Sequence, residues 1–377
     1  MRLERLALAL VLAAPAAVVA LMSSPASAAT AQEAADWLRS LGVKLNYKDA
    51  TPELVATATS VTFDTLKAGQ LVPADLAKLS ALPKLQEVNL GNKSGSDEAV
   101  HVLVGAVPTL KRLSLHGAPI TDKALADAAK LPLEQLTIFS TKVTDAGMAS
   151  VAAMTKLQKL DISKTGIGDA GLATLSKLGL AELWYNDMKG VTRAGMASIA
   201  AMPRLRKLVI QFAAIDAEVE ELAKSSSLAD LTLMSSKLTD AGGVQLAKLK
   251  GLTDLFVWST AVTDKTMAAI ATLPKLKVLY VSNTPITDAG LKSLAKVKTL
   301  EVLWADRTPV GDAGVGALAS LPALRWLKVD DTKVTDAGVA KLAAAKALET
   351  LDARKTGVTD AGVAKFKAAH PKARVSK

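Results

Sequence analysis

An acidic residue returns every 23 or 24 residues along most of this chain, within phrases such as "VTDAGVAK", which occurs at 334–341 and again at 358–365. Two independent domains would not share one register, so a fixed period of this length indicates a single repeat architecture. We therefore expect residues 71–365 to form one solenoid of about 12 units, each of about 24 residues. The recurring aspartates are Asp122, Asp145, Asp169, Asp216, Asp240, Asp264, Asp288, Asp312, Asp336 and Asp360, and Arg193 fills the one gap.

Each unit has two halves that differ in the spacing of their apolar residues. The first half reads "LxxLxL", as in Leu276, Leu279 and Val281, and its last two apolar residues are two apart, which is the period of a strand. The second half places apolar residues three and four apart, as in Leu291 and Leu294, which is the period of a helix. A strand followed by a helix in constant order predicts a parallel sheet with the helices on its other side.

With these halves, the chain resembles the leucine-rich repeat family over about 300 residues. The variant is the bacterial "TDAGL" type, similar to the ribonuclease-inhibitor-like and F-box-associated repeats. The resemblance implies an α/β fold, a right-handed leucine-rich repeat solenoid (horseshoe) with a parallel β-sheet on the concave face and helices on the convex face. Where the family's "LxxLxLxxN" ends in Asn, this chain usually has Thr, whose hydroxyl can bond the turn backbone: Thr141, Thr165, Thr260, Thr284, Thr308, Thr332 and Thr356.

The repeated phrase itself is predicted to be structural. Its Thr immediately precedes the helical half, where it suits an N-cap, and its Asp falls in the first turn, where the helix dipole favours a negative charge. Its Gly follows two residues later, and we expect no side chain to fit there against the neighbouring unit. A row of metal-binding aspartates is the less favoured alternative, because each acid already has a capping role. The clearest copies are Thr144, Asp145 and Gly147; Thr287, Asp288 and Gly290; Thr335, Asp336 and Gly338.

The first 28 residues are predicted to be a signal peptide. Arg2 and Arg5 precede an apolar run at 6–21, and Ala26-Ser27-Ala28 fits the small-x-small pattern of a cleavage site. A membrane anchor is the alternative, but the apolar run is short of a full span. The chain has no cysteine, which excludes disulfides, thiolate zinc sites and a lipid-anchored cysteine. We expect an exported protein without a membrane span in its mature form, either periplasmic or extracellular.

Both ends of the solenoid need caps, because terminal repeats expose the core. Residues 29–70 are predicted to be the N-terminal cap, with a helix near Trp37 and two short strands, "VKLNY" and "SVTFD", that could pair as a hairpin. Residues 366–377 are predicted to be the C-terminal cap, with the end of a helix and a last short strand. The unit at 180–200 is irregular, since it inserts a residue and could bulge at 186–190. Either function or drift would explain it.

Catalysis is not expected from this sequence. The three histidines, His101, His116 and His370, are spread along the chain, and none of the phrases HExxH, GxSxG, GxxxxGK[ST] or GxGxxG occurs. We therefore predict no enzyme, no cofactor and no metal site. The formal net charge of +10 comes mostly from scattered lysines, which is typical of a solvated exterior and not of a nucleic-acid reader.

The strand positions that flank the buried apolar pair face the concave side and are free to vary. Seven of the 13 aromatic residues (five Trp, five Phe and three Tyr) fall at such positions. Phe256, Tyr280 and Trp304 hold the same position in three consecutive units and could stack at the strand spacing of about 4.8 Å. Stacking that only stabilises the sheet is the alternative to binding. The predicted binding residues are Phe139, Trp184, Asp254, Phe256, Trp258, Tyr280, Trp304, Asp306, Trp326 and Asp330.

These observations predict a monomeric, non-catalytic scaffold that binds a protein or peptide through an aromatic and acidic patch. The acids would favour a partner with a basic segment. A carbohydrate-binding surface protein that uses the same tryptophans is one alternative, and a purely structural envelope protein is another. An adaptor role, as in the similar F-box-associated repeats, would require a helical domain before the repeats, and residues 30–64 are too short for it.

Overall fold

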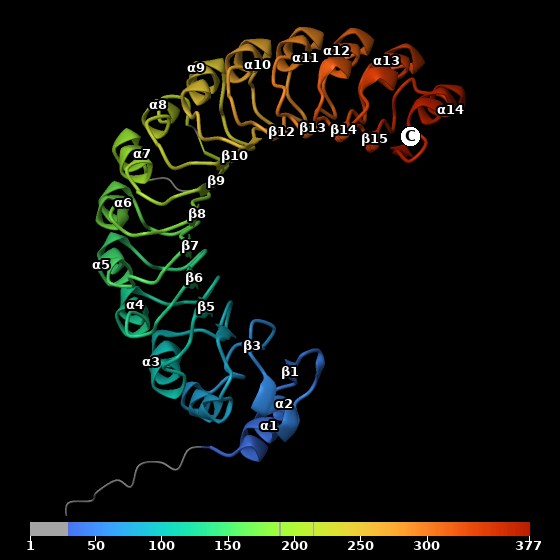
Figure 1. Cartoon of the computed structure of the whole chain (residues 1–377). Coiled ribbons are helices and arrows are strands. Elements are labelled where there is room, and N and C mark those ends of the chain that lie inside the picture. Colours follow the sequence, from blue (N-terminus) through green and yellow to red (C-terminus); the bar gives the residue numbers. More distant parts are fainter. Residues whose placement is uncertain (1–28, 188–189, 214) are drawn as a thin grey trace, which may run out of the picture.

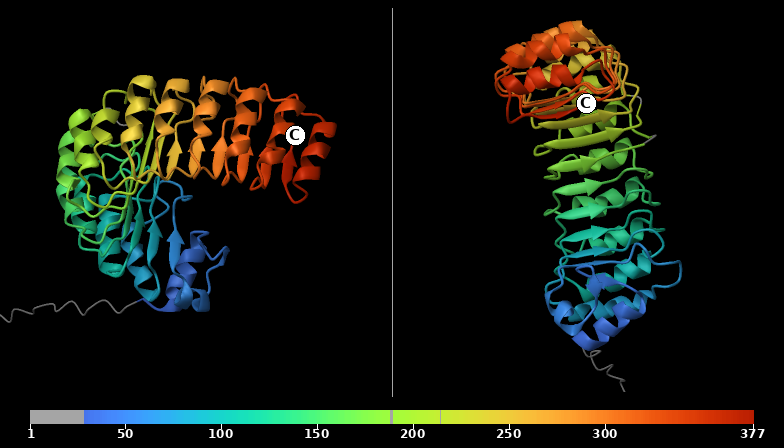
Figure 2. Two further views of the ribbon diagram at one scale, coloured as in Figure 1. Left: turned by 45° about the horizontal axis from the view of Figure 1, so that its top comes forward. Right: turned by 90° about the vertical axis from the view of Figure 1, so that its right-hand side faces the viewer.

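The computed structural model describes residues 29–187, 190–213 and 215–377. The predicted signal peptide and part of the predicted 186–190 bulge lie outside the described residues. The rest of the chain forms a curved solenoid in which strands line the inner side and helices the outer side (Figure 1). The two further views show the strands stacked one above another along a single arc (Figure 2).

One parallel sheet of 14 strands runs through the molecule in chain order, from β3 to β16. Most strands have three residues, and the middle residue is buried while its two neighbours are half-buried. The strands are β3 (Ser60–Thr62), β4 (Glu87–Asn89), β5 (Arg112–Ser114), β6 (Gln135–Thr137), β7 (Lys159–Asp161), β8 (Glu182–Trp184), β9 (Lys207–Gln211), β10 (Asp230–Met234), β11 (Asp254–Phe256), β12 (Val278–Tyr280), β13 (Val302–Trp304), β14 (Trp326–Lys328), β15 (Thr350–Asp352) and β16 (Arg374–Ser376).

A short helix follows most of the strands on the convex side. The α-helices are α1 (Ala31–Ser40), α2 (Pro52–Thr57), α3 (Asp97–Ala106), α4 (Asp122–Ala128), α5 (Met148–Ala152), α6 (Asp169–Leu175), α7 (Arg193–Ala200), α8 (Val219–Leu222), α9 (Asp240–Gly243), α10 (Asp264–Ile270), α11 (Asp288–Leu294), α12 (Asp312–Ala317), α13 (Asp336–Lys341) and α14 (Asp360–Ala369). Five 3₁₀ helices complete the set: η1 (Pro73–Ala81), η2 (Asp145–Gly147), η3 (Val244–Lys248), η4 (Leu318–Ser320) and η5 (Leu342–Ala344).

The core is a continuous column of leucines between the sheet and the helices. Leu255, Leu279, Leu303 and Leu327 occupy matching positions on neighbouring strands, and each is fully buried. Burying a leucine side chain contributes about 1.5–3 kcal/mol, so one such column supplies a large part of the stability of the sheet. The expected alternation of strand and helix, with the sheet on the concave side and the helices on the convex side, is confirmed.

The first strand of the main sheet, β3, lies before residue 71, where the solenoid was expected to begin. The segment "VKLNY" turns back on itself, so that β1 (Lys44–Leu45) pairs with β2 (Lys48–Asp49). The segment "SVTFD" contains β3, which pairs in parallel with β4 as part of the long sheet. A hairpin between the two segments was therefore the wrong pairing. Both segments alternate apolar and polar residues, and this spacing alone does not distinguish local pairing from parallel pairing.

A left-handed residue stands in the turn that leaves each strand from β4 to β15. Its φ lies between +50° and +58° in eleven non-glycine cases, and Gly117 has +65°. The amide of this residue donates to the next unit, as from Ser259 to the Ser282 carbonyl at 2.9 Å. The residue that follows is usually the Thr of "LxxLxLxxT", whose hydroxyl donates to the carbonyl three residues earlier at 2.5–2.8 Å. These hydroxyls therefore close the turn within their own unit.

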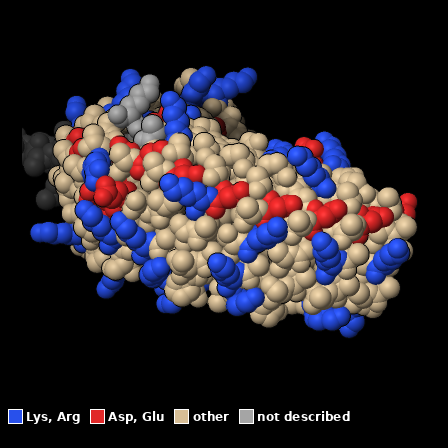
Figure 3. Space-filling model, turned by 90° about the horizontal axis from the view of Figure 1, so that it is seen from above, with Lys and Arg blue, Asp and Glu red and all other residues tan. Residues whose placement is uncertain are grey.

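The aspartates of the repeated phrase bond forward to the next unit, in an arrangement we call the aspartate ladder. Asp264 Oδ1 accepts the amides of Thr287 at 2.7 Å and Gly290 at 2.9 Å, while its Oδ2 accepts the Thr287 hydroxyl at 2.6 Å. The same forward bonds to Thr recur at Asp97, Asp122, Asp169, Asp216, Asp240, Asp312 and Asp336, and Asp145 and Asp288 bond forward to Gly168 and Gly311. The role of each Asp thus extends beyond the dipole of its own helix. Acidic side chains form a row along this side of the solenoid (Figure 3).

Threonine and glycine of the phrase have matching roles. Thr287 lies at the N-cap of α11, where its hydroxyl accepts the Ala289 amide at 3.3 Å, and Thr144 and Thr335 have equivalent bonds. A Cβ on Gly290 would lie 2.5 Å from Asp264 Oδ1, and Gly147, Gly171, Gly314 and Gly338 meet the preceding aspartate at the same distance. The glycine is thus required because the forward-reaching carboxylate occupies the space of a side chain.

Some units replace this glycine by a larger residue, and one of them is the unit of Asp264. Thr266 stands in the glycine position, is fully buried, and bonds Asp240 through both its amide and its hydroxyl. The preceding unit has an additional glycine, Gly243, on which a Cβ would collide with the Thr266 hydroxyl and lie 3.0 Å from its Cγ2. Gly243 and Thr266 are therefore a compensating pair across two units.

The irregular unit also connects forward, but with opposite charge. Arg193, which replaces the aspartate, donates to Glu220 at 2.7 Å and to Glu221 at 2.8 Å. Both acids lie in α8, the first helix after α7. The unit at 180–200 therefore keeps the inter-unit link of the aspartate ladder while it changes the chemistry of the link.

Candidate functional site

Four aromatic rings from neighbouring strands meet on the concave face, and we call them the aromatic cluster: Phe256, Tyr280, Trp304 and Trp326. Phe256, Tyr280 and Trp304 are register partners on β11, β12 and β13. The Phe256 and Tyr280 ring centroids are 4.7 Å apart in an edge-on arrangement, and Tyr280 stacks on Trp304 at 4.0 Å with 4° between the planes. The sequence-based expectation of a row of three rings thus agrees with these contacts.

The indole of Trp304 is covered on both of its faces. Tyr280 covers one face, and Lys328 on the opposite neighbouring strand places its Nζ 4.8 Å from the ring centroid. The Trp304 Nε1–H is buried and has no hydrogen-bond partner among the described residues. Burial and the Asp254 carboxylate together raise the pKa of the Tyr280 hydroxyl above its ordinary value. The Tyr280 hydroxyl is thus neutral at physiological pH. Because both faces of the Trp304 indole are covered, only its edge remains uncovered by a ring or a cation.

Trp326 is the exposed ring of the aromatic cluster. It meets Trp304 edge-on with centroids 5.2 Å apart, and 37% of its surface is accessible. Its Nε1–H donates to Asp352 Oδ2 at 2.8 Å, which fixes the orientation of the ring. Trp326 thus combines a large apolar surface with a rigid position, which is the combination that favours tight contacts in protein interfaces.

The predicted acids are largely paired inside the protein. Asp306 is 4% exposed, and its carboxylate accepts the Ser282 hydroxyl at 2.5 Å and lies 3.2 Å from Arg307 Nε and 3.5 Å from Lys328 Nζ. Asp330 Oδ1 accepts the amide of Arg354 at 2.7 Å, and Asp254 accepts the Thr253 hydroxyl at 2.6 Å. These acids hold the strands and the cations in place, so they attract a basic partner less than free carboxylates would.

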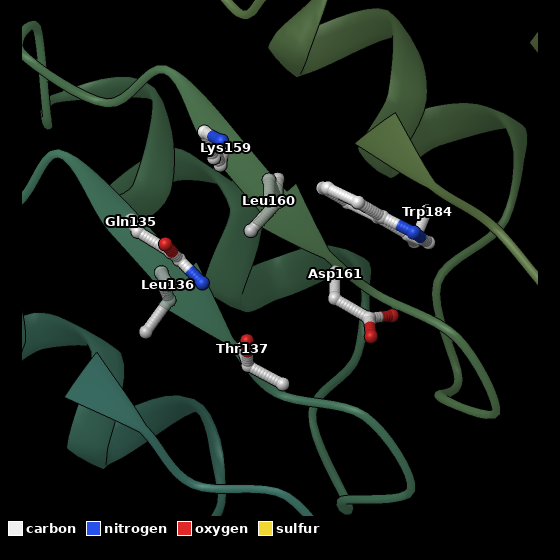
Figure 4. Close-up of a pocket in the computed structure, with 7 residues that line it drawn as sticks. All are labelled: Gln135, Leu136, Thr137, Lys159, Leu160, Asp161 and Trp184. Carbon is white, nitrogen blue, oxygen red and sulfur yellow. The ribbon is translucent and has the colours of Figure 1, made fainter. Parts of the chain in front are cut away.

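Three predicted residues lie outside the aromatic cluster. Trp258 follows β11 by two residues and forms no ring contact with the cluster in the described part of the chain. Phe139, just after β6, has the Lys164 ammonium 5.7 Å from its ring centroid. Trp184 on β8 borders a separate cavity of about 220 Å³, together with Asp161 and residues of β6 and β7 (Figure 4). The concave face therefore carries two separate candidate sites.

Sequence reasoning missed two exposed aromatic residues. Phe212 is 63% exposed and has a φ of +58°, in the left-handed turn position where the other units have Asn, Gly, Ser, Lys, Asp or Arg. A bulky side chain is unusual at positive φ, so Phe212 marks a position where strain is tolerated. Tyr47 is 97% exposed in the turn between β1 and β2. Alignment of the turn residues of all units would have identified Phe212.

Among the described residues, no group of three or more His, Asp or Glu side chains is placed to hold a metal ion. None of the helices at 29–187, 190–213 and 215–377 is long and apolar enough to cross a membrane.

Comparison with known proteins agrees with the architecture. A leucine-rich repeat sequence profile matches residues 153–176 and 272–295, which are two of the units. No curated protein matches the chain in sequence.

Solved structures show the same architecture at low identity. An internalin (InlF) from Listeria monocytogenes matches with a TM-score of 0.53 and 18% identity, over 92% of this chain and 95% of the other. The complex of Rad7 and Elc1 from yeast matches with a TM-score of 0.53 and 17% identity, over 81% of this chain and 84% of the other. A leucine-rich repeat protein from Leptospira interrogans matches with a TM-score of 0.49 and 15% identity, over 80% and 92%. At such identities, the first two similarities establish the fold alone.

Proposed function

Because the chain folds as a solenoid of leucine-rich repeats, we propose that it is a non-catalytic scaffold whose concave sheet binds a protein partner at the aromatic cluster. The observation that carries the proposal is the exposed and rigidly held ring of Trp326 at the edge of three packed rings. Interfaces concentrate their binding energy in such aromatic anchors, surrounded by a polar rim. Lys328, Asp330 and Arg354 supply a rim of this kind.

A protein partner fits this cluster better than a sugar does. A sugar ring packs on the open face of an aromatic side chain, and both faces of Trp304 are covered. A protein surface can instead approach the ring edges and the exposed part of Trp326. The buried Trp304 Nε1–H is also available to a carbonyl of a partner, if the edge of the cluster opens. The glycan alternative therefore no longer includes Trp304, and it is left with Trp184, Trp258 and Trp326.

A catalytic role has little support in the geometry. The nearest approach to a nucleophile and base is Ser114 Oγ, 3.1 Å from His116 Nδ1 on the same face of β5. The other ring nitrogen of His116 lies 3.4 Å from the amide of Asn92, which carries no negative charge to orient and stabilise a protonated imidazole. We propose that this pair serves packing, since His116 fills the space beside Gly91.

We also propose that the protein is exported. The N-terminal sequence has the charge pattern, apolar run and cleavage site of a secretory signal. An exported solenoid would meet its protein partner in the periplasm or outside the cell. We propose that it acts there as a monomer.

Affinity capture with three forms of the protein tests the function. The wild type, Trp326→Ala and Trp326→Phe are immobilised and exposed to the envelope fraction of the source cells. A specific partner is retained by the wild type and by Trp326→Phe, which keeps an aromatic ring, and is lost with Trp326→Ala. Circular dichroism checks that all three are folded. Equal retention by the wild type and Trp326→Ala would contradict binding at the aromatic cluster.

A further inference from the structure

A second pocket lies on the concave face, away from the aromatic cluster. It spans β6, β7 and β8, encloses about 220 Å³, and is lined by Gln135, Leu136, Thr137, Lys159, Leu160, Asp161 and Trp184 (Figure 4). We call it the indole pocket. Strands β9 and β10 separate it from β11, the first strand of the aromatic cluster. Its volume falls below the roughly 300–1,000 Å³ of pockets that enclose small-molecule ligands, so it suits a single side chain.

The carboxylate of Asp161 stands out among the charges around the indole pocket. Lys159 is paired with Glu182 at 2.9 Å, and Lys207 is paired with Asp230 at 2.9 Å. Asp161 accepts the amide of Ser163 through Oδ1 at 2.9 Å, and among the described residues it forms no ion pair. The pocket therefore contains a negative charge whose neighbours are already neutralised in pairs.

Trp184 provides an aromatic surface beside this carboxylate. It is the register partner of Asp161 on the adjacent strand. In the described part of the chain it has no ring stacked on it and no cation over it, which distinguishes it from Trp304. An indole face next to a carboxylate is the arrangement that holds a cationic side chain, because the ring quadrupole and the negative charge both attract it.

We propose that the indole pocket receives one arginine side chain of the protein partner. The planar guanidinium stacks on the face of Trp184 and donates to the Asp161 carboxylate. This inference rests on the proposed function, because the arginine belongs to the partner that the aromatic cluster binds. In this proposal the basic group of the partner is recognised by Asp161 and not by Asp306 or Asp330, which are paired inside the protein.

The proposal is tested with the whole protein and a minimal probe. The indole N–H resonances of the five tryptophans are recorded by NMR, and Trp184 is assigned by its absence in Trp184→Phe. N-acetyl-arginine methylamide is expected to shift the Trp184 resonance in a saturable manner. N-acetyl-citrulline methylamide, which has nearly the same shape but no charge, is the control. An unperturbed Trp184 resonance, or equal shifts with both probes, would overturn the proposal.

Removal of the carboxylate gives a second readout. Asp161→Asn is expected to weaken binding of the arginine probe on the order of tenfold, while the other four indole resonances stay in place. An unchanged affinity would contradict the role of Asp161. The same variant separates the two proposals in the capture experiment. If Trp326→Ala abolishes capture and Asp161→Asn does not weaken it, the aromatic cluster stands and the arginine pocket fails. If neither matters to capture, the proposed function fails.

Discussion

At the scale of single residues, the repeated phrase is a set of mutual constraints between neighbouring units. An Asp in one unit occupies the space where the next unit would place a Cβ, so the next unit has Gly. For those of these glycines that lie in helices, helix propensity predicts that alanine would be more stable, whereas the lack of space for a Cβ predicts that alanine would be less stable. The threonine cap could be predicted from the sequence because it depends on local spacing, and the need for glycine because this residue recurs at the same place in many units. The partner of each Asp could not, because it lies 22 to 26 residues ahead.

Gly243→Ala should lower stability, although alanine is the better helix former. The added Cβ collides with Thr266, and overpacking of this kind costs about 1–3 kcal/mol. The second change Thr266→Gly should recover most of the loss in the double variant. Gly105→Ala is the matched control, since no atom lies within 4 Å of its Cβ position and a small stabilisation of up to about 1 kcal/mol is expected. Urea unfolding midpoints of the four proteins measure these effects, and a stabilised Gly243→Ala would contradict the steric explanation.

The aspartate ladder makes stability depend on pH. Burial alone would raise the pKa of Asp240, but the hydrogen bonds from Thr263 and Thr266 outweigh it and leave the pKa lowered. A carboxyl with a lowered pKa stabilises the fold above its unfolded pKa of about 3.9, and this contribution is lost as the pH falls through the folded value. Asp240→Asn should therefore destabilise by on the order of 1–2 kcal/mol at pH 7, and by progressively less as the pH falls below about 3.9.

Thermal unfolding of the wild type and Asp240→Asn at pH 7 and at pH 3 checks this expectation. Asp49→Asn, an exposed carboxylate on β2, is the control and should change little at either pH. A difference between wild type and Asp240→Asn that stays constant from pH 7 to pH 3 would show that the charged form of Asp240 does not contribute.

At the scale of elements, the strands and helices follow the apolar spacing closely, and the departures come from contacts between units. The left-handed turn residue was missed because Asn92, Lys164, Phe212 and Arg307 share no side-chain property. Their backbone is set by the register of the next strand, to which most turn amides donate. The strand at 60–62 was assigned to a hairpin for the same reason, since its partner is chosen by the stacking of units. The ring contacts of Phe256, Tyr280 and Trp304 were accessible from the sequence, whereas the internal pairing of Asp306 and Asp330 was not.

Restoring the aspartate of the repeated phrase in the irregular unit, by Arg193→Asp, should lower the stability of the protein. Arg193→Asp would recreate the aspartate, but the next unit has Ile215 and Glu218 in place of Thr and Gly, and Glu220 and Glu221 would face a like charge. We expect a lower unfolding midpoint for Arg193→Asp than for Arg193→Ala, which only removes exposed ion pairs. A midpoint for Arg193→Asp above that of Arg193→Ala would contradict the pairing with α8.

At the scale of the whole molecule, the solenoid is a sum of interchangeable units on which two unique surfaces are built. The order of the strands and the parallel sheet could be predicted, because they depend on periodicity. The division of the concave aromatics into the aromatic cluster and the indole pocket could not, because it depends on which rings lie on adjacent strands and which have their faces covered.

Deletion of residues 265–288 should leave a folded, shorter solenoid. The deletion joins Asp264 to Ala289, so the phrase Thr-Asp-Ala-Gly is kept and each remaining unit still contacts only its neighbours. Far-UV circular dichroism and size-exclusion chromatography measure the outcome. Deletion of residues 265–276 is the control, since it removes α10 and keeps β12, and it should aggregate or unfold. Loss of cooperative folding in the in-register deletion would contradict the interchangeability of units.

Every carboxylate of the aspartate ladder precedes its donors in the chain. A polypeptide that leaves the ribosome amino end first therefore exposes each acceptor before the Thr and Gly that bind it have been made. The growing edge of the sheet is ready for the next turn at each moment of translation, and turns dock in the order of their synthesis. A denatured chain that refolds all at once has no such order, so we expect it to misalign units more often than the nascent chain does.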